Sequence, residues 1–185
     1  MAPSSPKPSP MDAKQVEPGN RIALLCGDYD PAHIGYFRAL EALVGRKGID
    51  EVWVAPFYSD RTGSEHIQSM CTTLATEAST ATKKLVGCCT VALSKRYRSP
   101  DEIRVWCQHA YPDVMFTIAR LDGTGEIAVL YANEKLDASS KAELVTVPYL
   151  PPPKDLRERI AAGEDMARHF CSSVWHYIQH FRLYR

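Results

Sequence analysis

The sequence predicts an α/β fold in which a parallel sheet carries helices on both faces. Two observations support this prediction. Short apolar segments of strand length, the first at 22–26, alternate along the chain with longer segments of helical periodicity. Strands that alternate with helices form right-handed βαβ units, and such units build a parallel, Rossmann-like sheet. The 185 residues are enough for one domain with a sizeable core, and we assign that domain to 21–185.

The predicted elements follow one another in a regular order. The continuously apolar run Ile22–Cys26 is typical of a strand buried on both faces. A helix then begins near Gly35, with apolar residues at helical spacing as far as Val44. We next expect a strand at 51–55, a helix at 65–85, a strand at 87–93, a helix at 100–109, strands at 114–119, 127–131 and 144–149, and a C-terminal helix whose apolar stripe runs from Met166 to Phe181.

The first 20 residues differ in composition from the rest of the chain. They are rich in Pro and Ser and show no hydrophobic period, so we predict a flexible N-terminal tail at 1–20. This segment lacks the apolar core of a secretory signal, and no apolar run is long enough to span a membrane. The six cysteines are scattered and form no C-x-x-C pair. These features predict a cytoplasmic protein with reduced thiols and no membrane partner.

The charge balance argues against one class of partner. Lys plus Arg and Asp plus Glu both number 22, so the formal net charge is zero. Nucleic-acid binders draw most of their affinity from an excess of basic residues that neutralise phosphates. We therefore do not expect nucleic acid to be the principal partner.

The loop after the first strand is where the fold class predicts a ligand. In an open α/β sheet, ligands bind beyond the carboxyl ends of the strands. Gly27 stands at the strand end and allows close approach of the backbone, while Pro31, His33 and Gly35 follow at a spacing with few coincidental matches. The free N–H groups and dipole of the helix that starts here favour an anion. The loop is thus predicted to bind an anionic group.

These residues resemble the signature of a known family. The nicotinate or nicotinamide mononucleotide adenylyltransferases, members of the cytidylyltransferase-like nucleotidyltransferase superfamily, read G-G-T/S-F-D/N-P-I-H-x-G-H in this loop. The positions that match are Gly27, Asp30, Pro31, His33 and Gly35, with Tyr29 in place of Phe. The C-terminal segment from Leu156 to Tyr184 resembles the tail of bacterial members, whereas the middle of the chain matches only thinly.

The resemblance implies a nucleotidyltransferase-type fold and a chemistry. Family members transfer AMP from ATP to a mononucleotide phosphate with Mg²⁺ and release pyrophosphate, without a covalent intermediate. By position, His33 would donate to an ATP phosphate and Arg157 would grip the β- and γ-phosphates. The other implied nucleotide-binding residues are Gly27, Asp28, Tyr29, Asp30, Gly35, Tyr36, Asp122 and Lys154. No set of protein metal ligands is predicted, and the resemblance also allows a homo-oligomer.

Departures from the family pattern cluster on the phosphate site. Tyr36 stands where the family has its second histidine, and a phenol carries no positive charge at neutral pH. Asp28 replaces a Thr or Ser, and a carboxylate there repels an anion unless a cation bridges them. Pro151–Pro153 and Lys154 replace the family's I-S-S-T, which removes hydroxyl and N–H donors.

Three interpretations of these departures remain open. The first is a divergent adenylyltransferase in which Tyr36, Lys154 and Arg61 take over the missing roles. The second is a nucleotide-binding or regulatory protein that keeps the fold but has lost adenylyl transfer. The third is a different transfer chemistry, or no nucleotide at all.

Each site residue also has a plain structural alternative. His33 could cap the following helix, and Arg157 could belong to a solvated charged face. Asp122 could be a turn residue. The basic cluster Lys95–Arg98 could contact a nucleotide or be a solvated strand end.

Overall fold

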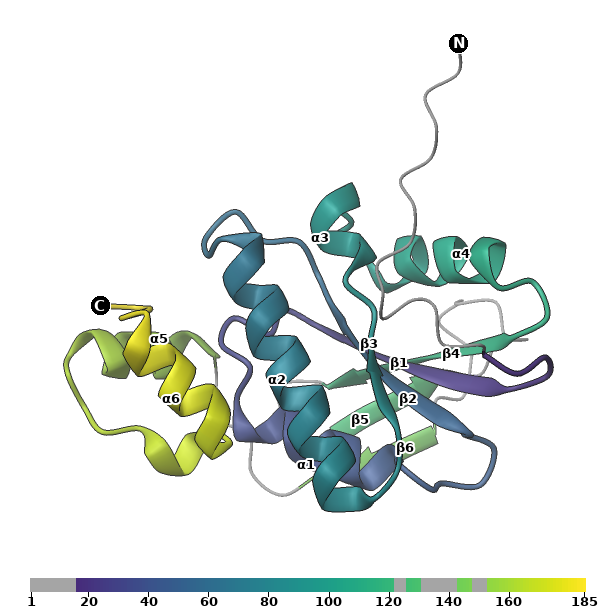
Figure 1. Cartoon of the computed structure of the whole chain (residues 1–185), viewed down its shortest axis with the longest axis horizontal. Coiled ribbons are helices and arrows are strands. Elements are labelled where there is room, and N and C mark those ends of the chain that lie inside the picture. Colours follow the sequence, from purple (N-terminus) through teal and green to yellow (C-terminus); the bar gives the residue numbers. More distant parts are fainter. Residues whose placement is uncertain (1–15, 122–125, 131–142, 148–152) are drawn as a thin grey trace, which may run out of the picture.

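A computed structural model describes residues 16–121, 126–130, 143–147 and 153–185 of the chain. Their strands form one sheet in the order β3-β2-β1-β4-β5-β6 (Figure 1). The first four strands in the chain, β1 (Arg21–Gly27), β2 (Glu51–Pro56), β3 (Val86–Cys88) and β4 (Met115–Leu121), are parallel to their neighbours within this group. This arrangement confirms the predicted Rossmann-like sheet. From β1 the chain adds β2 and β3 on one side of the sheet and then crosses to add β4 on the other side of β1. Such folds bind ligands at this switch in strand order, between β1 and β4.

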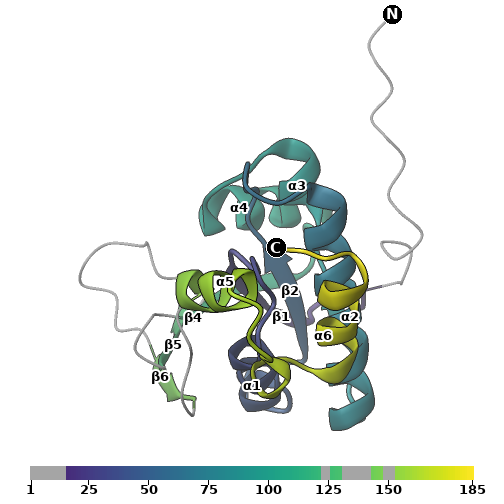
Figure 2. The same ribbon diagram turned by 90° about the vertical axis from the view of Figure 1, so that its left-hand side faces the viewer.

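Helices cover both faces of the sheet. On one face, α1 (Ile34–Leu43) and α2 (Ser64–Thr82) bury their apolar stripes in the larger of two hydrophobic clusters. On the other, α3 (Val91–Lys95) and α4 (Pro100–Ala110) pack over the smaller cluster. The remaining helices, α5 (Pro153–Ala161), the 3₁₀ turn η1 (Ala167–His169) and α6 (Ser172–His180), lie at one end of the sheet, with α6 against α2 (Figure 2).

The outer edge of the sheet is antiparallel, unlike its centre. β5 (Glu126–Leu130) pairs antiparallel with β4, and β6 (Glu143–Thr146) pairs antiparallel with β5. Only residues 122–125 separate β4 from β5. A parallel neighbour needs a crossover of a dozen or more residues, so a connection this short permits only a hairpin.

Two predicted elements were wrong in detail. The strand expected at 87–93 ends at Cys88, and the apolar residues that follow form α3, in which Ala92 and Leu93 are buried. A short apolar run has no period that separates a strand from a buried helix. The single C-terminal helix is likewise broken. Phe170 is extended between η1 and α6, so Met166 and Phe170 reach the core from outside α6.

The first described residues, 16–20, contact the rest of the fold. Val16 packs against the smaller hydrophobic cluster, and the N–H of Gly19 donates to the carbonyl of Asp113 at 2.7 Å. Residues 16–20 thus contact the domain, whereas 1–15 lie outside the described residues, and the flexible tail stays a prediction. Among the described residues, no helix combines the length and apolarity needed to cross a membrane.

Candidate functional site

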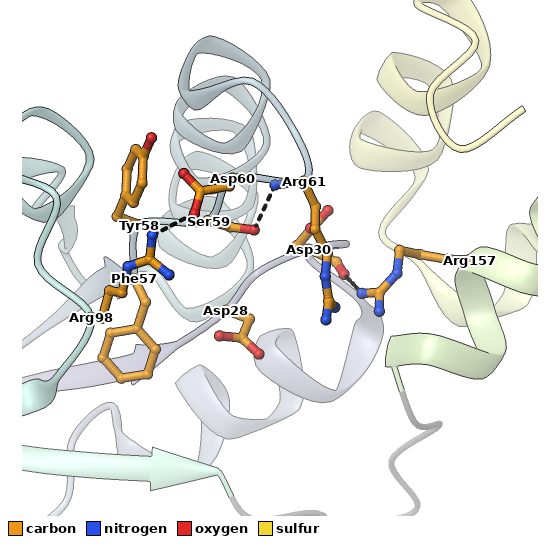
Figure 3. Close-up of a pocket in the computed structure, with 9 residues that line it drawn as sticks. All are labelled: Asp28, Asp30, Phe57, Tyr58, Ser59, Asp60, Arg61, Arg98 and Arg157. Atoms are coloured by element: carbon orange, nitrogen blue, oxygen red, sulfur yellow. Dashed lines mark hydrogen bonds and ion pairs between the residues drawn. The ribbon is translucent and has the colours of Figure 1, made fainter.

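A pocket of about 320 Å³ opens where the carboxyl ends of β1 and β2 meet the N-terminal half of α5 (Figure 3). The loop after β1 supplies Asp28 and Asp30, and the loop after β2 supplies 57–61. Arg98 comes from the turn between α3 and α4, and Arg157 comes from α5. The pocket therefore lies at the edge of the sheet where the fold class predicts a ligand.

Three arginines supply positive charge to this pocket, and each has different contacts. The Nη1 of Arg157 donates to the main-chain carbonyl of Asp30, and among the described residues the other N–H groups of its guanidinium have no hydrogen-bond partner. Arg98 lies 5.3 Å from the centre of the Tyr58 ring, and its Nη2 donates to Asp60. Within the described part of the chain, the guanidinium of Arg61 has no hydrogen-bond or ion-pair partner. The arrangement therefore offers donors suited to an anion.

Asp30 ties the loops around the pocket together. Its side chain is 2% exposed, and its Oδ1 accepts hydrogen bonds from Thr62 and from Tyr184, both at 2.7 Å. Its Oδ2 is buried without a hydrogen-bond partner among the described residues. One carboxylate thus joins the loop after β1, the loop after β2 and the C-terminal end of the chain.

His33 lies at the predicted edge of the sheet, but its side chain does not line this pocket. It is the N-cap of α1, and its Nδ1 accepts the N–H of Gly35 at 3.1 Å. Its ring is 2% exposed and lies 4.6 Å from the ring of Tyr36. Because Nδ1 is the acceptor, the neutral ring carries its proton on Nε2. The capping alternative is confirmed, and the donation to phosphate remains a prediction.

The start of α1 is less open to an anion than the sequence predicted. The Gly35 N–H is taken by the His33 side chain, and the Tyr36 N–H donates to the His33 carbonyl at 3.0 Å. Two of the donors that a helix start would offer are therefore already paired. The arginines, rather than this helix start, supply the cationic groups of the pocket.

The burial of His33 predicts that the stability of the fold depends on pH. Burial, with a smaller contribution from His169, lowers the His33 pKa from its usual 6.5 to about 4. The unfolded chain therefore gains a proton at a higher pH than the folded chain. The contribution of neutral His33 to the free energy of unfolding is therefore complete above the unfolded pKa of 6.5. It is lost as the pH falls toward the folded pKa of about 4. We expect about 2 kcal/mol of unfolding free energy to be lost from this group between pH 7 and about pH 4.5.

Urea unfolding of the wild type and of His33→Asn at these two pH values tests the expectation. Asparagine keeps a capping oxygen, but it does not titrate in this range. Between pH 7 and about pH 4.5, the variant should lose about 2 kcal/mol less unfolding free energy than the wild type loses. Equal falls in the two proteins would show that His33 does not titrate as its burial predicts.

Tyr36 fills the core beneath the loop instead of facing the pocket. Its hydroxyl accepts the N–H of Tyr29 at 3.3 Å, and the two rings stack with centroids 3.9 Å apart. Burial raises the pKa of Tyr36, so the phenol stays neutral. A Cβ at Gly27 would lie 2.6 Å from the Tyr36 hydroxyl oxygen, which explains the glycine at the end of β1. Tyr36 therefore does not replace the missing histidine as a pocket donor.

The remaining predicted residues are placed as follows. Tyr29 is fully buried, and its hydroxyl donates to the Leu25 carbonyl at 2.7 Å. Lys154 is exposed, forms an ion pair with Glu158 at 3.7 Å, and does not line the pocket. Asp122, Pro151 and Pro152 lie outside the described residues. Of the predicted nucleotide-binding set, the structure brings Asp28 and Asp30 to the pocket together with Arg157.

The first interpretation of the sequence names Arg61, which lines the pocket, whereas the pocket residues 57–60 were missing from the predicted site. They come from the loop after β2, which follows the strand next to β1 and so ends at the same edge of the sheet. This neighbouring loop was the signal that could have found them. Arg98 belongs to the basic cluster at 95–98, for which a nucleotide contact was one of two alternatives, and it does line the pocket.

Comparisons with known proteins agree with this fold. No protein-family model matches the chain. The chain is 26% identical over 194 residues to a probable nicotinate-nucleotide adenylyltransferase of Anaeromyxobacter sp. (strain K), with 90% of this chain and 98% of the relative covered. The solved nicotinic acid mononucleotide adenylyltransferase of Plasmodium falciparum has the same fold. Its complex with NaAD has a TM-score of 0.66 and its complex with APC one of 0.65, each at 15% identity over 89% of this chain and 97% of that one.

The sheet order defines an α/β protein with a Rossmann-like fold, and the solved structures that share this fold include nicotinic acid mononucleotide and putative nicotinate-nucleotide adenylyltransferases. Within this class, the chain is similar to the nicotinate-nucleotide adenylyltransferases along most of its length, which confirms the resemblance seen in the loop after β1.

Proposed function

We propose that this protein transfers the adenylyl group of ATP to nicotinate mononucleotide or nicotinamide mononucleotide, and so forms a dinucleotide and pyrophosphate. One observation carries the proposal. Arg61, Arg98 and Arg157 line a pocket at the carboxyl edge of the parallel strands, and among the described residues the guanidinium groups of Arg61 and Arg157 keep donors free for phosphate. The similarity to adenylyltransferases over 90% of the chain supports the same activity.

The arginines suit the charge changes of this reaction. A phosphate oxygen of the mononucleotide attacks the α-phosphorus of ATP, and the bond to the β-phosphate oxygen breaks. Negative charge then develops on the departing pyrophosphate. Preorganised cations at that position stabilise the transition state without a covalent intermediate. We assign this role to Arg157, which is anchored on the Asp30 carbonyl, and to Arg61.

Magnesium fits this pocket as an ion held partly by the nucleotide. Among the described residues, no group of three or more His, Cys, Asp or Glu side chains could hold a metal. Mg²⁺ typically uses one or two carboxylates together with substrate phosphates and water. The exposed carboxylate of Asp28 lines the pocket and is the hard oxygen ligand this mode needs. We propose that Asp28 holds the ion, which when bound neutralises phosphate charge and removes the repulsion of Asp28 for the nucleotide.

A second candidate is a nucleotide-binding protein that does not catalyse transfer. It is favoured by the burial of His33 and Tyr36, which leaves neither residue of the family's histidine motif in the pocket. Under this alternative ATP still binds to the arginines. The two candidates share their ligands and differ only in the chemical step. A cytoplasmic location and a homo-oligomeric state remain predictions from the sequence.

A pyrophosphate-release assay separates the two candidates. The full-length chain is given ATP, Mg²⁺ and in turn nicotinate mononucleotide, nicotinamide mononucleotide or cytidine monophosphate, and ATP binding is measured by calorimetry in parallel. The proposal predicts pyrophosphate with a pyridine mononucleotide and none with the cytidine control. Binding of ATP without any pyrophosphate would instead establish the second candidate.

A further inference from the structure

The C-terminal end of the chain reaches back to the pocket through Tyr184. The hydroxyl of this penultimate residue donates to Asp30 Oδ1 at 2.7 Å, across 154 positions of sequence. Leu183 and the Tyr184 ring pack against the larger hydrophobic cluster. Burial and the neighbouring Asp30 charge raise the pKa of Tyr184, so the phenol keeps the proton it donates.

The backbone at this end adopts a conformation that needs support. Arg182 and Tyr184 have φ of 51° and 66°, in the left-handed region that non-glycine residues seldom occupy. Such residues persist where surrounding contacts determine their position. Here those contacts are the packing of Leu183 and the hydrogen bond of Tyr184 to Asp30. The chain end is thus held in one placement that delivers a hydroxyl to the pocket loop.

The Asp30 carboxylate depends on both of the hydroxyl groups that donate hydrogen bonds to it. Its Oδ1 is shared by Tyr184 and Thr62, and its Oδ2 already lacks a partner among the described residues. A buried carboxylate deprived of a donor moves toward water or disturbs its surroundings, because leaving it unsatisfied is costly. The main chain of the same residue accepts the hydrogen bond that anchors Arg157, and Thr62 directly follows Arg61.

We infer that Tyr184 is a positioning residue for the phosphate site. Its hydroxyl fixes the Asp30 carboxylate, and the fixed loop in turn holds Arg157 and Arg61 at the pocket. Tyr184 itself does not line the pocket. The inference rests on the proposed function, since it assigns to these arginines the binding of ATP phosphates.

A double-mutant cycle tests whether Tyr184 acts through Arg157. Affinity for ATP with Mg²⁺ is measured by calorimetry on the full-length wild type, Tyr184→Phe, Arg157→Ala and the double variant. Tyr184→Phe keeps the ring and loses only the hydroxyl, and it should weaken ATP binding about tenfold. In the Arg157→Ala background the same change should cost clearly less than tenfold, because only the part of the effect that passes through Arg61 remains. A full tenfold loss in both backgrounds would overturn the inference.

Three further variants control for general loosening of the C-terminal segment and for a failure of Tyr184→Phe to fold. Tyr177→Phe removes a hydroxyl that lies 2.9 Å from His66 Nδ1, away from the pocket, and should leave ATP affinity unchanged. An equal loss in Tyr177→Phe would overturn the inference. Thr62→Val removes the other hydroxyl donor to Asp30 and should weaken ATP binding, while Thr62→Ser should restore it. This pair decides the question if Tyr184→Phe does not fold.

The readout also separates this inference from the proposed function. A wild type that binds ATP but releases no pyrophosphate removes the proposed reaction and leaves the double-mutant cycle fully measurable. A wild type that binds no ATP overturns both.

Discussion

Replacing Arg157 with alanine is expected to lower kcat/KM for pyrophosphate release by about two to three orders of magnitude. Arg157 is the pocket arginine whose position is fixed by a main-chain carbonyl, that of Asp30. A donor held in place before the reaction stabilises developing charge without a cost of reorganisation. Loss of its guanidinium removes both a cation and a fork of donors from the departing pyrophosphate.

Steady-state kinetics with ATP varied at saturating mononucleotide measures this effect. Arg159→Ala is the matched control, because Arg159 lies on the same helix and pairs with Glu164 at 2.7 Å instead of lining the pocket. The control should retain activity within about twofold, since an exposed ion pair contributes little. Equal activity of Arg157→Ala and the wild type would remove Arg157 from the phosphate site.

Replacing Gly27 with alanine is expected to lower the free energy of unfolding by about 2–3 kcal/mol. The added Cβ would lie 2.6 Å from the Tyr36 hydroxyl oxygen and 2.8 Å from Cε1 of the same ring. Tyr36 cannot simply swing aside, because its ring is buried and stacked on Tyr29. Either the ring or the end of β1 must therefore shift.

Urea unfolding of Gly27→Ala beside Gly63→Ala checks this expectation. At Gly63 the added Cβ meets only the end of the exposed Glu65 side chain, which is free to rotate away. The Gly63 variant should therefore stay within about 0.5 kcal/mol of the wild type. If the two variants were equally stable, the close approach of Tyr36 to β1 would be wrong.

The sheet and the position of the site could be predicted because both follow from local patterns. Continuously apolar strands, helical stripes and the Gly-Pro-His-Gly spacing lie within short windows of sequence. The roles of Tyr29 and Tyr36 could not be predicted in this way. Their matching positions suggested contacts with nucleotide, but whether a side chain points to the pocket or to the core depends on its packing partners. Both rings turn inward because the space beside Gly27 receives Tyr36.

The contacts between segments far apart in the chain could not be predicted from the sequence either. Arg98 reaches the pocket because α3 forms where an extended strand was expected, which sets the turn before α4 beside the loop after β2. Tyr184 meets Asp30 only once the C-terminal segment has folded back across the edge of the sheet. No spacing in the chain encodes such a contact, whereas the resemblance to a family did point to Arg157, which lines the pocket.

The most direct test of the central claim is to follow the phosphorus atoms of ATP by ³¹P NMR, with the full-length protein, Mg²⁺ and nicotinate mononucleotide. Adenylyl transfer predicts that ATP and mononucleotide signals fall together while dinucleotide and pyrophosphate signals rise in equal amounts. Two results would contradict the claim that Arg157 and Arg61 support attack at the α-phosphorus. They are release of ADP and inorganic phosphate, or an unchanged spectrum from protein that is shown to bind ATP.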